Sequence, residues 1–119
     1  MYKKNIGNIG EEKICEYLLK NGYTILKRNY FCRGGEIDII AQKDMDIAFV
    51  EVKTRRGNKF GTPAEAVTKR KMEAIKNCAY TYINETEDNN GYNYTFDVAE
   101  VTLSGEEFKI NYIRNAFYE

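Results

Sequence analysis

Two acidic residues and a lysine occur in otherwise apolar, strand-like segments of this chain. Asp38 interrupts the apolar run 37–40, and Glu51 and Lys53 lie two residues apart in segment 49–53. Residues two apart on a strand point to the same face. Two carboxylates brought together repel each other unless a cation joins them. Mg²⁺ binds one or two carboxylates and shares the phosphate oxygens of a substrate. The expected chemistry is therefore metal-assisted attack of water at a phosphate, with Lys53 orienting the water or stabilising the developing charge.

Each of these residues also has a purely structural interpretation. Glu51 and Lys53 can form a salt bridge at a strand end, or the lysine can extend outward to solvent along its own aliphatic stem. Asp38 can cap a turn. The spacing alone leaves both interpretations open.

Two further charged residues occupy apolar stripes of predicted helices. Glu11 precedes Ile14, Cys15 and Leu18 by three, four and seven positions, and Lys71 lies four residues from both Val67 and Ile75. Such spacings place residues on one helical face. Each helix is therefore expected to turn one charge toward the sheet that carries the strand residues. This indicates a polar site.

Basic residues are concentrated in the middle of the chain. Residues 27–76 hold twelve Lys/Arg against seven Asp/Glu, whereas residues 77–119 hold two against eight. A basic segment on a neutral protein is a candidate binding surface for nucleic-acid phosphates, and unevenly charged solvated surface is the alternative. The candidate phosphate-binding residues are Arg55, Arg56, Lys59, Lys69 and Arg70.

Composition narrows the remaining possibilities. A chain of 119 residues is expected to form a single domain, 1–119, with one core. The absence of histidine excludes a Ser-His-Asp triad and leaves carboxylates, lysines, tyrosines or a metal for catalysis. The three cysteines, with no CxxC pair, are expected to be reduced. No apolar run is long enough to span a bilayer and no signal peptide is recognisable, so no membrane association and a cytoplasmic location are expected.

The order of predicted elements is typical of an α/β protein. The pattern predicts helices over 8–20 and about 62–83, the second beginning at Thr62-Pro63. It predicts strands over 23–30, 35–41, 47–55, 94–103 and 108–113. This α-β-β-β-α-β-β order indicates a mixed sheet of about five strands flanked by helices.

Several motifs resemble one known family over nearly the whole length of the chain. They include Gly-Glu-Ile-Asp-Ile-Ile-Ala at 35–41 and Phe-Val-Glu-Val-Lys-Thr-Arg at 49–55. Similar stretches lie at 7–11, 28–30, 60–67, 96–98 and 115–117, together with Lys71. In order and spacing they resemble the YraN family of predicted endonucleases. That family is similar to archaeal Holliday-junction resolvases and to the PD-(D/E)xK nucleases.

The resemblance implies a restriction-endonuclease-like core and a catalytic set. By resemblance, Asp38 and Glu51 are metal ligands for Mg²⁺ or Mn²⁺, Lys53 is the catalytic lysine, Glu11 is the helix-borne acid and Lys71 is an auxiliary phosphate contact. Ile37 stands where the superfamily motif has proline, which ligates nothing.

The implied activity is hydrolysis of DNA phosphodiester bonds, with branched or repair-associated DNA as candidate substrates. A homodimer is expected by analogy, because cutting both strands of a junction ordinarily calls for two-fold symmetry. The alternative is a non-catalytic nucleic-acid-binding or assembly module with the same fold. An RNA-cleaving domain is a weaker third possibility.

Overall fold

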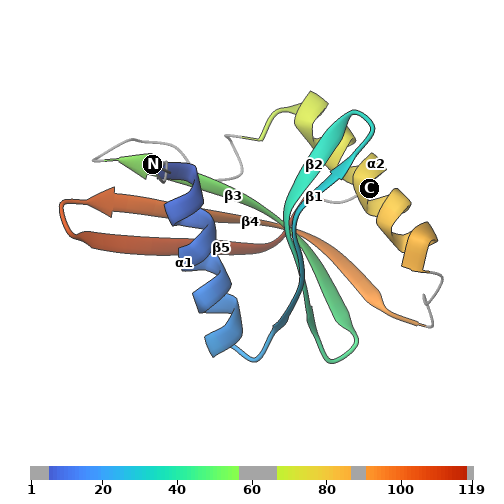
Figure 1. Cartoon of the computed structure of the whole chain (residues 1–119), viewed down its shortest axis with the longest axis horizontal. Coiled ribbons are helices and arrows are strands. Elements are labelled where there is room, and N and C mark those ends of the chain that lie inside the picture. Colours follow the sequence, from blue (N-terminus) through green and yellow to red (C-terminus); the bar gives the residue numbers. More distant parts are fainter. Residues whose placement is uncertain (1–5, 57–66, 87–90, 118–119) are drawn as a thin grey trace, which may run out of the picture.

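The computed structural model describes residues 6–56, 67–86 and 91–117. In these residues two helices and five strands follow one another in the predicted order (Figure 1). The helices are α1 (Ile6–Lys20) and α2 (Lys69–Thr86). The strands are β1 (Thr24–Cys32), β2 (Gly35–Lys43), β3 (Asp46–Arg56), β4 (Asn93–Ser104) and β5 (Glu107–Phe117).

The strands form one mixed sheet in the order β1-β2-β3-β4-β5. Neighbouring strands are antiparallel except β3 and β4, which run parallel and are separated in the chain by α2. A parallel pair needs a crossover connection, usually helical, which explains why a helix intervenes at this point alone. The predicted α/β architecture with a five-stranded mixed sheet is confirmed.

The two helices cover opposite faces of the sheet. Adjacent strand residues point to opposite faces, and Phe49 packs in the core beneath α2 whereas Val50 packs in the core beneath α1. The predicted apolar stripe of α2 is buried, since Ile75 and Cys78 are almost inaccessible to solvent. Within the described residues, neither helix is long and apolar enough to cross a membrane.

The end of α1 follows the predicted stop signal. Gly22 has a positive φ of 89°, and Tyr23 N donates to Leu18 O at 2.9 Å while Gly22 N donates to Leu19 O at 3.1 Å. This pair of bonds is a Schellman motif, which requires a left-handed residue after the last helical turn. Asn21-Gly22 therefore ends the helix and directs the chain into β1.

The predicted start of the second helix is wrong in its described part. Val67 and Thr68 are not helical, and α2 begins at Lys69. Thr68 caps the helix, because its Oγ1 accepts a hydrogen bond from Lys71 N at 3.2 Å. Val67 is buried in the core, as predicted, but outside the helix. The capping signal at Thr62-Pro63 lies outside the described residues.

The prediction that all cysteines are reduced is also wrong. Cys32 at the end of β1 and Cys78 in α2 form a disulfide, and Cys15 alone is free. Cys32 and Cys78 are separated by 46 positions in the chain, and their Cα atoms are 5.5 Å apart. The sequence criteria of an odd count and wide spacing could not detect two cysteines that only the tertiary fold brings together.

Replacing Cys78 by Ser is expected to lower the free energy of unfolding by about 2–4 kcal/mol, because the unfolded chain loses a covalent loop. Urea titration with and without reductant measures the effect. The wild type should become as labile as Cys78→Ser when reduced. Alkylation in denaturant without reductant provides the control, and it should modify Cys15 alone. Modification of all three cysteines would contradict the disulfide.

Candidate active site

The candidate site lies where β2 and β3 separate. The two strands pair from Lys43↔Asp46 to Ile39↔Val50, and the ladder ends there. Figure 1 shows the two strands side by side near their connecting turn and diverging at the other end. Asp38 and Glu51 are the first residues beyond the last pair. Asp38 Oδ2 accepts a hydrogen bond from Val52 N at 2.8 Å, and so replaces a bond that the ladder no longer supplies.

Asp38 and Glu51 form a close pair of carboxyl groups. Glu51 is only 3% exposed. Burial and the adjacent Glu51 carboxylate raise the pKa of Asp38 to about 8. A hydrogen bond between the two side chains acts in the same direction. Without a cation, therefore, the pair holds a proton near neutral pH, as expected for two carboxylates in one poorly solvated place.

Two lysines approach this pair. Lys71 Nζ lies 2.6 Å from Glu51 Oε2, and Lys53 Nζ lies 3.6 Å from the same oxygen. Burial lowers the pKa of Lys71, but its hydrogen bond to Glu51 and the carboxylate charges outweigh burial, so that its pKa is raised. Lys71 is therefore an ammonium group. Glu51 and Lys53 lie on one face of β3, and α2 supplies Lys71 from its first turn.

Glu11 lies beside this cluster on α1. Its Oε1 is 3.8 Å from Arg28 Nη2, and the side-chain amide of Asn29, in its favoured orientation, donates to Glu11 and Glu36. Burial raises the pKa of Glu11, and the charges of Glu36 and Glu51 add to that rise although Arg28 opposes it. Glu11 is thus within electrostatic reach of Glu51, but it does not line the cleft that exposes Asp38 and Glu51.

The position of α1 depends on a close approach at Gly10. A Cβ there would overlap Thr54 Oγ1 of β3. Only a residue without a side chain lets the helix lie this near the strand, which explains a glycine inside a helix. The contact holds the start of α1, and with it Glu11, against the diverging end of β3.

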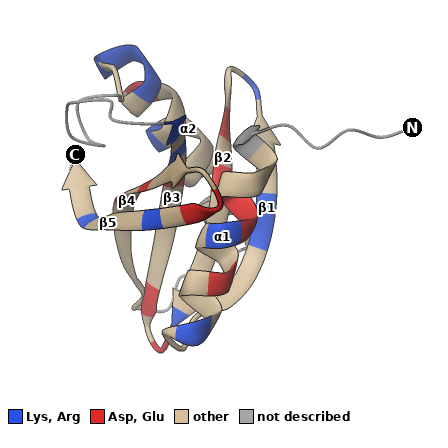
Figure 2. Ribbon diagram, turned by 90° about the vertical axis from the view of Figure 1, so that its left-hand side faces the viewer, with Lys and Arg blue, Asp and Glu red and all other residues tan. Residues whose placement is uncertain are grey.

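The carboxyl pair lines an open cleft of about 570 Å³. The cleft is bounded by the β1–β2 hairpin tip and by the start of α2. The lining comprises Phe31, Gly34, Gly35, Glu36, Asp38, Glu51, Thr68, Arg70, Lys71 and Ala74. Figure 2 shows basic residues gathered along α2. The cleft is thus acidic on the sheet side and basic on the helix side.

The five candidate phosphate-binding residues do not form one surface. Arg55 Nε lies 2.5 Å from the buried Glu100 on β4, so this arginine is held in an ion pair. Arg56 lines a separate cavity with Lys13 and Phe108. Lys69 and Arg70 are exposed in the first turn of α2, and of these two only Arg70 lines the cleft. Lys59 lies outside the described residues.

Sequence reasoning missed the walls of the cleft. Phe31, Glu36 and Thr68 were not predicted to belong to a site. The available signal for Phe31 was an aromatic residue close to the predicted turn at Arg33-Gly34. Thr68 carried no signal, because the helix was expected to begin six residues earlier.

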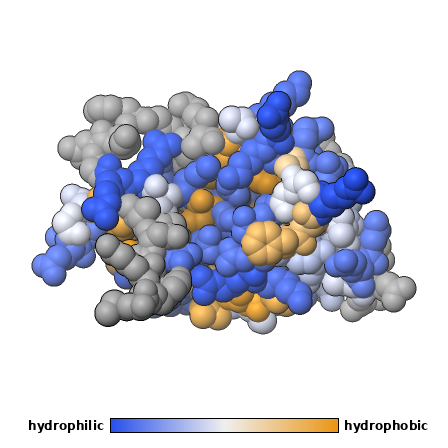
Figure 3. Space-filling view, turned by 45° about the horizontal axis from the view of Figure 1, so that its top comes forward, coloured by the Kyte–Doolittle hydropathy of each residue, from blue (hydrophilic) through white to orange (hydrophobic). Residues whose placement is uncertain are grey.

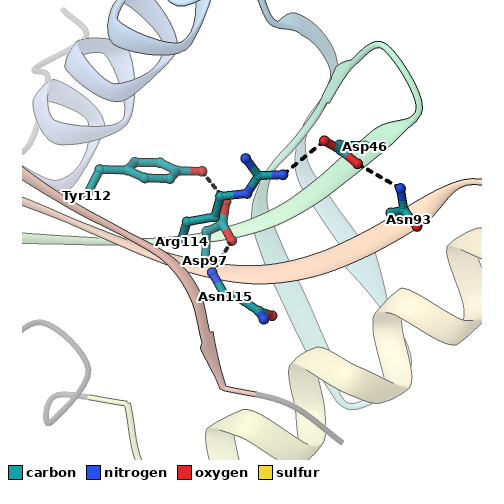
Figure 4. Close-up of polar contacts among 6 residues, drawn as sticks. All are labelled: Asp46, Asn93, Asp97, Tyr112, Arg114 and Asn115. Carbon is teal, nitrogen blue, oxygen red and sulfur yellow. Dashed lines mark hydrogen bonds and ion pairs between the residues drawn. The ribbon is translucent and has the colours of Figure 1, made fainter.

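A second polar cluster, across β3, β4 and β5, is structural (Figure 4). The fully buried Asp97 accepts hydrogen bonds from Tyr112 Oη and, at 2.8 Å, from Asn115 N. Asn115 has a positive φ of 56° at a register irregularity between β4 and β5. Asp97 therefore caps a kink in β5. Asp46 joins the three strands by accepting from Asn93 and Arg114.

Comparison with known proteins identifies the family of this chain. The sequence profile of the Uncharacterised protein family UPF0102 matches residues 10–101. A UPF0102 protein from Caldicellulosiruptor saccharolyticus is 48% identical over 119 residues, covering 98% of this chain and 100% of the relative. One from Alkaliphilus metalliredigens is 49% identical over 114 residues, covering 96% and 98%. The resemblance to the YraN family is therefore confirmed, because YraN and UPF0102 are names of one family, and the chain belongs to the uncharacterised protein family UPF0102.

Proposed function

We propose that this chain is a Mg²⁺- or Mn²⁺-dependent endonuclease with a restriction-endonuclease-like core. Its substrate is DNA, with branched or repair-associated DNA as candidates. One observation carries the proposal: Asp38 and Glu51 meet in a cleft, and the ammonium groups of Lys71, which lines the cleft, and of Lys53 approach the same Glu51 carboxylate. Carboxylates bind hard cations, and ammonium groups bind phosphate.

The donor set fits a magnesium-like ion. Among the described residues no group of three or more His, Cys, Asp or Glu side chains is placed to hold a metal. Mg²⁺ is usually held by one or two carboxylates, with water and substrate phosphate completing its shell. Asp38 and Glu51 would hold the ion, which when bound polarises phosphate oxygens and neutralises developing charge.

The charged residues in and beside the cleft have roles that follow from their charges. Lys53, on the same strand face as Glu51, would stabilise negative charge on the phosphate during attack of water. Lys71 and Arg70, from the start of α2, would hold the neighbouring backbone phosphates. The Val52 N–H keeps the Asp38 carboxyl oriented toward the cleft. Glu11 would act from outside the cleft, through its charge.

Cleavage of a nucleic-acid panel tests this proposal. Single-stranded, duplex, flapped and four-way-junction DNA, with matched RNA, would be incubated with Mg²⁺, Mn²⁺ or chelator. We expect cutting of DNA that depends on either metal and stops with chelator. Preferential cutting of RNA would mean that the substrate is RNA rather than DNA. No cutting of any substrate, or cutting that resists chelator, would overturn the proposal.

A non-catalytic nucleic-acid-binding module is the second candidate. The contact that favours it is the 2.6 Å ion pair between Lys71 and Glu51, which compensates one carboxylate without a metal. This candidate predicts salt-dependent DNA binding that needs no metal and survives Glu51→Gln. Binding that persists in Glu51→Gln without cleavage in the wild type would select it.

The Lys71–Glu51 contact predicts competition between lysine and metal. Lys71→Met frees a carboxylate oxygen and removes a positive charge close to the ion. It is expected to tighten Mn²⁺ binding by about tenfold, roughly 1.4 kcal/mol. Calorimetric titration of Mn²⁺ measures the affinity, with Lys76→Met on the same helix as the matched control. Unchanged or weaker binding in Lys71→Met would contradict the competition.

A further inference from the structure

Phe31 is the most exposed large apolar side chain among the described residues, at 71%. Seen from the upper side of Figure 1, the surface is mainly hydrophilic, with small apolar patches (Figure 3). Phe31 differs from the other exposed apolar residues because it lines the cleft that contains Asp38 and Glu51. An aromatic ring at the rim of a charged cleft is a feature that core packing does not explain.

The hairpin tip that carries Phe31 is firmly held. Its neighbour Cys32 is bonded to Cys78 of α2. Gly35 packs so closely on α2 that a Cβ there would lie 3.1 Å from the Ala74 Cβ. Little flexibility therefore remains to be lost when a ligand contacts the ring, which favours binding.

Register places the ring next to the reactive end of the cleft. Phe31 pairs with Glu36 across the hairpin, and Glu36 precedes Asp38 by two residues on β2. Two strand residues span roughly 7 Å. Along the strand direction, the backbone position of Phe31 is therefore displaced from that of Asp38 by about this distance. Arg70 and Lys71 of α2 line the same cleft.

We propose that Phe31 stacks on an unpaired base adjacent to the phosphate held at Asp38 and Glu51. Aromatic side chains stack on bases of any sequence, but bases inside a continuous duplex already stack on each other. The site therefore takes single-stranded segments, in free strands, flaps or junctions, in preference to unbroken duplex. This inference rests on the proposed function for the position of the phosphate, whereas the stacking itself is testable by binding alone.

Affinity measurements with chelator present test the stacking without cleavage. Phe31→Ala should weaken binding of a single-stranded oligonucleotide about tenfold and alter binding of a blunt duplex by no more than about twofold. Phe31→Trp should retain single-strand affinity. Phe108→Ala is the matched control, since Phe108 is an exposed aromatic outside the cleft, and it should alter neither affinity.

Fluorescence gives a direct second readout, because the chain contains no tryptophan. The single indole in Phe31→Trp should be quenched by the single-stranded oligonucleotide and not by blunt duplex, whereas that in Phe108→Trp should respond to neither. Absence of quenching together with wild-type affinity in Phe31→Ala would overturn the stacking. If metal-dependent cleavage persisted in that case, the proposed function would stand. Quenching without cleavage by the wild type would instead reject the nuclease and retain the single-strand site.

Discussion

Glu51→Gln is expected to reduce metal-dependent cleavage by at least about 100-fold. The side chain is almost fully buried, and one of its oxygens faces both Lys71 and Lys53. An amide has nearly the same shape as the carboxylate but no charge, so the variant keeps the packing and loses an anionic ligand. It also loses the anionic group that pairs with the side-chain ammonium groups of Lys53 and Lys71. The measurement is the initial rate of cleavage at saturating metal.

Glu100→Gln is the matched control for this experiment. Glu100 is a buried carboxylate on the neighbouring strand, held by Arg55 and absent from the cleft. It therefore shares with Glu51 the consequences of removing a buried charge, but not the proposed role. Comparable loss of cleavage in both variants, with comparable destabilisation, would show that folding rather than chemistry is affected. Undiminished cleavage in Glu51→Gln would mean that the site lies elsewhere.

Local sequence signals were sufficient to predict the strands and their order. The apolar segments 37–41 and 47–50 and the short polar turn between them predict two neighbouring strands. That adjacency is enough to bring Asp38 near Glu51, and the structure shows this proximity. The approach of Lys71 to the sheet, where its Nζ reaches Glu51, was predicted from its spacing to Ile75. This spacing does not depend on where the helix begins, so the error in the helix start left it intact.

The cleft itself could not be predicted, because it depends on long-range geometry. Nothing in the local pattern indicates that β2 pairs with β3 only from Ile39 onward, or that Asp38, just before that point, accepts from Val52 N in place of a ladder partner. The disulfide between Cys32 and Cys78 likewise depends on how α2 packs on the hairpin. Charge counts along the chain treated Arg55 and Arg70 alike. Only the fold separates an arginine paired with Glu100 from one that lines the cleft.

The pKa of Asp38 makes the stability of the metal-free protein depend on pH. In the unfolded chain this group ionises near its ordinary value of 3.8, whereas in the fold its pKa is about 8. Between these values the folded state binds one more proton than the unfolded state, so stability falls as pH rises. The slope is at most about 1.4 kcal/mol per pH unit. Because Asp38 is half-buried and lines an open cleft, screening by solvent reduces the total, and about 2–4 kcal/mol is expected.

Asp38→Asn should abolish the loss of stability with rising pH. An amide does not ionise, and its oxygen can still accept a hydrogen bond from Val52 N. Urea titrations of metal-free protein from about pH 5 to about pH 8 should show a falling free energy of unfolding for the wild type and a flatter profile for the variant. Glu16→Gln, which removes an exposed carboxylate from α1, controls for net charge and should follow the wild type.

Saturating Mg²⁺ at the upper pH should restore stability to the wild type but not to Asp38→Asn, since only the wild type retains both ligands. Parallel pH profiles for wild type and Asp38→Asn would mean that Asp38 is not the group that carries the proton. A gain of stability from Mg²⁺ in both proteins would mean that the ion binds somewhere other than the Asp38–Glu51 pair.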